Sequence, residues 1–144
     1  MKIPRILLAE DNENDIELML TALKEYNLIN EVSVVRDGVA ALDFLHRRGG
    51  FEDVPAGNPA VVMLDLKMPR LGGLDVIKIM KKDPKLQLIP IVVLTSSKLE
   101  SDLMESYKMG VNAYVVKPVD FNEFMIAIKN IGVFWAILNE PPVR

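Results

Sequence analysis

The chain alternates short apolar runs with segments of helical periodicity, and this alternation restricts its fold more than any other feature. The apolar runs are four to six residues long and rich in Val, Ile and Leu. They lie at Ile6–Ala9, Val32–Val35, Ala60–Leu64, Ile89–Leu94 and Ala113–Val116. Runs of this kind are typical of strands that helices cover on both faces.

Between the runs, apolar residues recur at the spacing of one helix face. They are Ile16, Met19, Leu20 and Leu23; Gly38, Ala41, Leu42 and Leu45; Ile77 and Met80; Leu99, Leu103 and Tyr107; and Phe121, Phe124, Met125 and Ile128. Five strands that alternate with five helices predict an α/β fold with a doubly wound, five-stranded parallel sheet.

Length and composition favour a single domain and exclude several kinds of site. We expect one domain over residues 1–144. A net charge of -3 argues against a general nucleic-acid binder. With no Cys and the single His46, the chain has neither a disulfide scaffold nor a multi-histidine metal site. The longest apolar run, Ile131–Leu138, is too short to span a membrane and no signal peptide is evident, so we expect a cytoplasmic protein.

One segment, Arg47–Pro59, breaks the alternation. It contains three of the eight Gly and two of the nine Pro, which predicts a long loop between the second helix and the third strand. A surface insertion without a function of its own and a loop that binds a partner both fit this composition.

The polar residues that follow the first, third, fourth and fifth predicted strands are candidates for a functional site. Glu10 and Asp11 follow the first strand, Asp65 the third, Thr95 the fourth and Lys117 the fifth. Because the carboxyl ends of parallel strands meet at one edge of the sheet, we expect these side chains to converge there.

Three carboxylates at one edge need a compensating cation. Two such charges 4 Å apart repel by roughly 4 kcal/mol at an effective dielectric constant near 20. With only oxygen ligands available, the cation is expected to be Mg²⁺ or Mn²⁺. An Asp can also act as a nucleophile and form an acyl phosphate. The metal, the Lys117 ammonium and the Thr95 hydroxyl would then neutralise the transferred phosphoryl group.

Four ordered motifs make the chain resemble the receiver domain of two-component response regulators, over residues 3–131. Thirty residues separate Asp65 from Thr95, and 22 separate Thr95 from Lys117, which fits the family without a gap. The motifs are LLAEDN with Glu10 and Asp11, VVMLDLKMPRLGG with Asp65, IVVLTSS with Thr95, and AYVVKP with Lys117.

The resemblance implies a flavodoxin-like receiver fold and a phosphoacceptor, Asp65. The phosphoryl donor would be a phosphohistidine of a sensor histidine kinase. Asp11 would bind Mg²⁺ directly and Glu10 through water, and the backbone carbonyl of Lys67 would complete the ligands. The Gly72-Gly73 pair is expected to supply the close approach and the positive φ that this loop requires.

The resemblance also implies a conformational switch. Thr95 would hydrogen-bond the attached phosphoryl group and Lys117 would pair with it. Tyr114 stands where the family has its switch aromatic, three residues before the lysine.

The long loop and the apolar C-terminal tail are similar to those of single-domain regulators associated with phytochromes. The fifth helix is expected to extend over about 120–138, with more apolar surface than one face of the domain covers. The tail would form a homodimer through Phe134, Trp135 and Leu138, contact the kinase, or pack on its own domain. Because no residues remain for an output domain, output would pass through protein contacts or onward phosphotransfer.

Three alternatives compete with this interpretation. An aspartyl-phosphate phosphohydrolase would need a second Asp where Lys67 stands. A flavin carrier would need a Gly-, Ser- and Thr-rich phosphate loop after the first strand, where the chain has Glu10-Asp11-Asn12-Glu13. A pseudo-receiver that binds without phosphorylation stays open.

Overall fold

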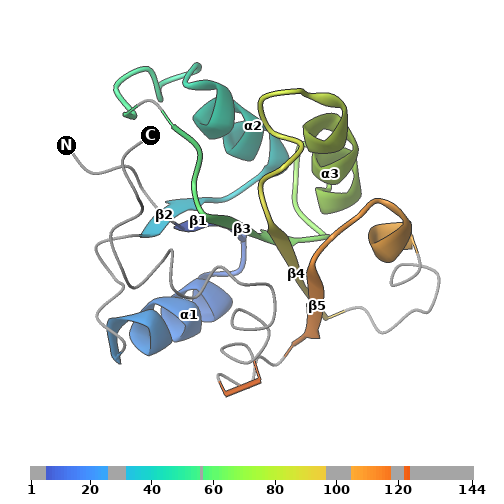
Figure 1. Cartoon of the computed structure of the whole chain (residues 1–144). Coiled ribbons are helices and arrows are strands. Elements are labelled where there is room, and N and C mark those ends of the chain that lie inside the picture. The colour runs from blue at the N-terminus through green and yellow to red at the C-terminus, as the bar shows by residue number, and fades with distance from the viewer. Residues whose placement is uncertain (1–5, 26–31, 56, 97–104, 118–121, 124–144) are drawn as a thin grey trace.

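The computed structural model describes residues 6–25, 32–55, 57–96, 105–117 and 122–123. Its five strands form one sheet in the order β2-β1-β3-β4-β5, and all neighbouring strands are parallel (Figure 1). In chain order the elements are β1 (Ile6–Ala9), α1 (Glu13–Glu25), β2 (Val32–Val35), α2 (Gly38–His46), β3 (Val61–Asp65), α3 (Gly73–Lys82), β4 (Ile91–Thr95) and β5 (Ala113–Val116).

The predicted α/β fold with a parallel five-stranded sheet is confirmed. The fourth strand begins two residues later than expected, at Ile91, because Pro90 has no N–H to donate to the sheet. Residues 105–108 are helical, within the predicted fourth helix. The predicted fifth helix at about 120–138 lies almost wholly outside the described residues. No helix in the described part of the chain has the length and apolarity needed to cross a membrane.

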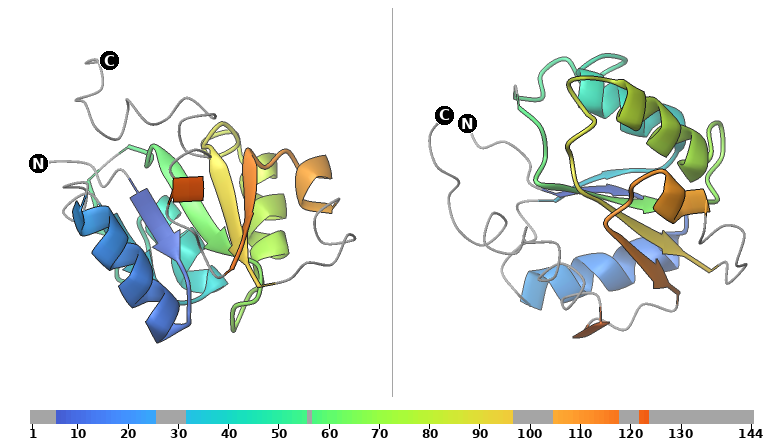
Figure 2. Two further views of the ribbon diagram at one scale, coloured as in Figure 1. Left: turned by 90° about the horizontal axis from the view of Figure 1, so that it is seen from below. Right: turned by 45° about the vertical axis from the view of Figure 1, so that its right-hand side comes forward.

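The sheet is the middle of three layers. Helix α1 lies against one face, and α2 and α3 lie against the other (Figures 1 and 2). Successive strand residues face opposite layers: Leu7 and Val62 pack with α2 and α3, whereas Leu8 and Met63 pack on the side of α1. Burial on both faces explains why the strands are apolar without alternation.

The loop between β3 and α3 folds back tightly on the strand that precedes it. The Gly73 N–H donates to the carbonyl of Leu66 at 2.9 Å. A Cβ atom at Gly73 would lie 2.4 Å from the carbonyl oxygen of Asp65. The expected close approach is therefore confirmed at Gly73.

The expectation of positive φ at the glycine pair is wrong. Gly72 has φ -73°, and the left-handed residue of this loop is Arg70, with φ 67°. Arg70 is the middle residue of a tight turn in which the Leu71 N–H donates to the carbonyl of Pro69 at 2.7 Å. The hydrogen bond of this turn spans a single residue, and that residue has the positive φ. In this loop the residue is Arg70 rather than a glycine.

The N-terminus of α2 supports this loop. One oxygen of Asp37 caps the helix by accepting from the Ala40 N–H at 2.7 Å, and the other accepts from Arg70 at 3.2 Å. A Cβ atom at Gly38 would lie 2.1 Å from the carbonyl oxygen of Leu71, so the helix and the loop meet backbone against backbone. This contact fixes the loop that follows Asp65.

The Arg47–Pro59 loop is anchored at both of its ends. The Phe51 ring packs edge-on against Phe44 of α2, with 5.5 Å between the ring centroids. The Asn58 side chain donates to the carbonyl of Lys85 at 2.7 Å. At the end of α2, His46 lies 2.7 Å from the Asp83 carboxylate. The predicted loop is thus present, and its described part packs against the domain.

Substitution of the two adjacent glycines tests the close approach. We expect Gly73→Ser to lower the free energy of unfolding by roughly 1–3 kcal/mol, because its Cβ atom meets backbone that has no space to yield. Gly72→Ser is the matched control: its nearest contact is 3.4 Å and a Ser suits the N-cap position of α3. Denaturant unfolding measures both, and equal losses would contradict the packing described.

Candidate functional site

The carboxyl edge of the sheet carries an open pocket with polar walls. Glu10 and Asp11 directly follow β1, Asp65 is the last residue of β3, and Lys117 directly follows β5. The pocket has a volume of about 720 Å³. Its walls are formed by Asp11, Asn12, Glu13, Asp15, Asp65, Lys67, Ser96 and Lys117.

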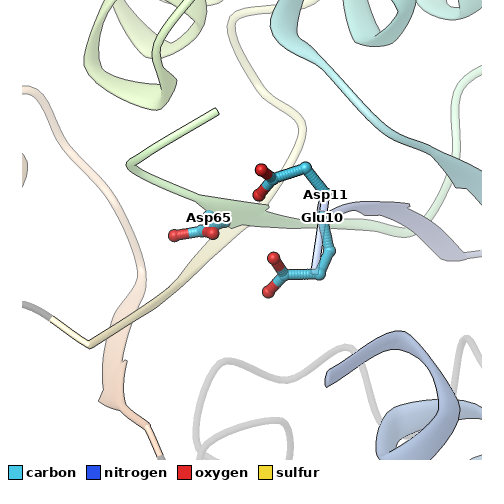
Figure 3. Close-up of side chains that lie close together, drawn as sticks. All are labelled: Glu10, Asp11 and Asp65. Carbon is cyan, nitrogen blue, oxygen red and sulfur yellow. The ribbon is translucent and has the colours of Figure 1, made fainter. Parts of the chain in front are cut away.

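Three carboxylates, those of Glu10, Asp11 and Asp65, lie close together at this edge of the sheet (Figure 3). One oxygen from each of Glu10, Asp11 and Asp65 lies within 4.8 Å of the others. Glu10 is only 2% exposed and Asp65 only 5%, whereas Asp11 is exposed to solvent. The predicted convergence of the three acids is therefore present in the structure.

The carboxylate of Asp65 is held by both of its oxygens. Oδ1 accepts a hydrogen bond from the Lys67 N–H at 3.2 Å, and Oδ2 lies 3.3 Å from Nζ of Lys117. The first of these bonds closes a local turn, which fixes the side chain at the end of β3. The carboxylate is thus oriented toward the pocket without being sealed from it.

The Lys117 ammonium joins carboxylates from three parts of the chain. It contacts Glu10, lies 2.8 Å from Asp15 of α1 and lies 3.3 Å from Asp65 of β3. Burial alone would lower the pKa of Lys117, but the hydrogen bonds to Asp15 and Glu10 and the charge of Asp65 raise it above its ordinary value. The lysine is therefore a permanent cation inside the cluster.

Asp15 is a site residue that the sequence motifs did not indicate. Its position follows from the start of α1: the Asn12 side chain caps the helix by accepting from the Asp15 N–H at 3.0 Å. That bond places Asp15 in the first turn, beside the pocket. The sequence signal was an acid near the start of a helix, which is common because such acids stabilise helix N-termini.

Burial also sets the charge of Glu10. It raises the pKa of this carboxyl to about 7; the hydrogen bond from Lys117 opposes the rise, and Asp65 adds to it. The Asn12 N–H further donates to Glu10 at 3.1 Å. The effect of burial on Glu10 therefore outweighs that of the hydrogen bond from Lys117.

The donor set fits a hard divalent cation. The three clustered carboxylates offer only oxygen ligands, and Mg²⁺ and Mn²⁺ prefer such ligands. The open pocket beside Asp65 leaves space for a phosphoryl group.

The other predicted residues lie in the pocket wall, in the sheet, against the core or outside the described residues. Lys67 is an exposed part of the pocket wall. The backbone of Thr95 pairs with Val116 at the same edge of the sheet. Tyr114 is half-buried against the core on the α2 and α3 side, and its ring centroid lies 6.4 Å from that of Tyr107. Phe134, Trp135 and Leu138 lie outside the described residues.

Comparison with known proteins identifies the family. The model of the response regulator receiver domain matches residues 6–129. The chain belongs to the response regulator receiver domain family. Its site lies at the expected edge of the receiver fold, and the phosphohydrolase and flavin-carrier alternatives are not favoured.

Its relatives include response regulators of phytochromes and bacteriophytochromes. Response regulator Rcp1 of Synechocystis sp. is 37% identical over 90% of this chain and 87% of its own length. The solved bacteriophytochrome response regulator RtBRR is 54% identical, with a TM-score of 0.85 over 98% of this chain and 85% of its own. The phosphorylated cyanobacterial phytochrome response regulator RcpA is 35% identical, with a TM-score of 0.78 over 99% of this chain and 100% of its own. This receiver is thus homologous to phytochrome-associated regulators of two-component systems.

A further solved structure bears on the metal. It is the Mn²⁺-bound form of Rcp1, which is 35% identical with a TM-score of 0.76, over 96% of this chain and 97% of its own.

The buried acid predicts a pH dependence of stability in metal-free buffer with a chelator. Because folding raises the pKa of Glu10, the native state binds the extra proton between the ordinary pKa, near 4.5, and about 7. Stability should therefore fall as pH rises through this range. We expect Glu10→Gln to abolish that fall and to be more stable than wild type at pH 8, by roughly 1–3 kcal/mol.

The control for this prediction is Glu17→Gln, an exposed position on α1. It should keep the wild-type pH profile in denaturant unfolding. If the stability of Glu10→Gln falls with pH as steeply as that of wild type, another group causes the pH dependence.

Proposed function

We propose that this receiver accepts a phosphoryl group on Asp65 from a phosphohistidine of a sensor histidine kinase, a phytochrome being the candidate, and that it does so in the cytoplasm. The observation that carries the proposal is the arrangement of Asp65, which lies open to the pocket between a lysine ammonium and two further acids. Phytochrome regulators among the relatives support the choice of kinase.

Mg²⁺ is the proposed metal, with Mn²⁺ as an alternative that the Mn²⁺-bound Rcp1 structure supports. Asp11, Glu10, Asp65 and the backbone carbonyl of Lys67 would hold it. When bound, it supplies positive charge to the oxygens of the transferred phosphoryl group.

The chain's own residues perform the remaining tasks. Asp65 is the nucleophile, and its turn with the Lys67 N–H keeps one carboxylate oxygen aligned. Lys117 neutralises charge on the phosphoryl oxygens. The receiver thereby catalyses its own phosphorylation and dephosphorylation, and no other reaction is proposed.

Signalling would begin at Thr95. We propose that its hydroxyl moves to bond the phosphoryl group and that Tyr114 rotates into the space it leaves. The contact between the rings of Tyr114 and Tyr107 would carry the change to the surface beside residues 105–108. Output would then pass through protein contacts or onward phosphotransfer.

Phosphorylation is tested with acetyl phosphate and Mg²⁺, read by intact mass. We expect wild type to gain one phosphoryl group, and only with the metal, because the phosphoryl charge needs neutralisation. Asp65→Asn should gain none, whereas Asp75→Asn, at an exposed Asp of α3, should behave as wild type. Full uptake by Asp65→Asn would refute the assignment, and no uptake by wild type would favour a pseudo-receiver.

The switch is tested by Thr95→Ala. We expect this variant to accept the phosphoryl group but to lose the shifts of the Tyr107 and Tyr114 ring signals in NMR spectra, because the hydroxyl that senses the group is gone. Ser96→Ala, which removes the neighbouring hydroxyl from the pocket wall, is the control and should keep them. Wild-type shifts in Thr95→Ala would contradict the mechanism.

We further propose a homodimer through the apolar tail. Three large side chains per subunit, Phe134, Trp135 and Leu138, would each contribute roughly 1.5–3 kcal/mol on burial. Doubled by a two-fold axis, this offsets an association cost of roughly 4–15 kcal/mol. Sedimentation should show wild type as a dimer and the variant Phe134→Asp, Trp135→Ala as a monomer. Monomers in both cases at high micromolar concentration, with and without phosphorylation, would assign the tail to the kinase or to the domain itself.

A further inference from the structure

Among the described residues, the Lys117 ammonium has as many carboxylate partners as it has protons. An ammonium has three N–H donors. Within the described residues, Glu10, Asp15 and Asp65 each offer it a carboxylate. Asp65 is the most distant of the three, at 3.3 Å against 2.8 Å for Asp15. The lysine is therefore drawn toward Glu10 and Asp15, away from the proposed phosphoacceptor.

Of the two closer partners, Asp15 is the one that can be released. Glu10 is buried, so loss of its cation would leave a charge without solvent. The Asp15 side chain is 28% exposed and forms part of the pocket wall, so water can replace the lysine. Its backbone stays in place meanwhile, because the Asn12 cap fixes the first turn of α1.

We propose that Asp15 is a positioning residue that holds the Lys117 ammonium back from Asp65 and thereby limits the rate of phosphoryl uptake. The inference rests on the proposed function. In the transfer, an Asp65 oxygen forms a bond to phosphorus while the bond from phosphorus to the donor atom breaks. The donor atom is a ring nitrogen in phosphohistidine, which leaves as histidine, and an oxygen in acetyl phosphate, which leaves as acetate. Lys117 must donate to a phosphoryl oxygen during this step, and the proton that points to Asp15 is the one it can redirect.

The test compares two carboxylates in the same pocket wall. Asp15→Asn removes a partner of Lys117, whereas Glu13→Gln removes a carboxylate that pairs with Arg36. With acetyl phosphate and Mg²⁺, we expect the rate of uptake to rise roughly tenfold in Asp15→Asn, which corresponds to about 1.4 kcal/mol of activation free energy. Glu13→Gln should stay within about twofold of wild type, and Asp15→Glu, which keeps the ion pair, should restore the slow rate.

A second measurement reports on the ion pair between Lys117 and Asp15 itself. The ¹⁵N signal of the Lys117 ammonium should shift in Asp15→Asn without metal or donor and stay in place in Glu13→Gln. Equal uptake rates in wild type and Asp15→Asn, or equal increases in Asp15→Asn and Glu13→Gln, would overturn the inference while the proposed function stands. No Asp65-dependent uptake in wild type would overturn the proposed function and this inference with it.

Discussion

The interaction on which the site depends is the contact of one lysine ammonium with acids from three parts of the fold. Lys117 reaches Glu10 after β1, Asp15 on α1 and Asp65 on β3. Without it, these carboxylates would repel one another where little water is present to screen them. Burial raises the pKa of Glu10 to about 7 even though the hydrogen bond from Lys117 lowers it. The clustered carboxylates of Glu10, Asp11 and Asp65 offer a divalent ion the oxygen ligands it prefers.

Backbone packing holds this charge cluster in place. The loop that follows Asp65 is pressed against the end of β3 at Gly73 and against the start of α2 at Gly38. Arg70 adopts a left-handed conformation in the loop and is paired with Asp37. Rigid support of this kind is what a site needs if its charges are to stay close without relaxing apart.

Much of the fold could be predicted from the sequence because its strands are buried on both faces. A continuous apolar run such as Val61–Leu64, bounded by turn residues, is typical of a strand covered on both sides. Because parallel strands end at one edge of the sheet, Asp65 could also be predicted to lie near Glu10 and Asp11, as it does. Strand ends were harder to predict: Asp65 pairs with Leu94 within the sheet although it is polar.

The positions that escaped prediction depend on geometry that no local pattern encodes. Asp15 resembles its neighbours Glu13 and Glu17 in sequence, and only the rotation of α1 on the sheet turns it toward Lys117. The left-handed conformation of Arg70 was missed because glycine is the usual residue in that conformation. Here the residue is an arginine, and its side chain forms an ion pair with Asp37. Both depend on contacts between elements distant in the sequence.

The central claim is that the Lys117 ammonium and a divalent cation compete for the same carboxylates. Calorimetric titration with Mg²⁺ at pH 8 tests it most directly, on wild type, Lys117→Met and Lys67→Met. Lys67 supplies a second positive charge to the same pocket wall, so it controls for the general potential. The predicted result is tighter Mg²⁺ binding in Lys117→Met than in the other two proteins. Weaker or unchanged binding in Lys117→Met would contradict the claim.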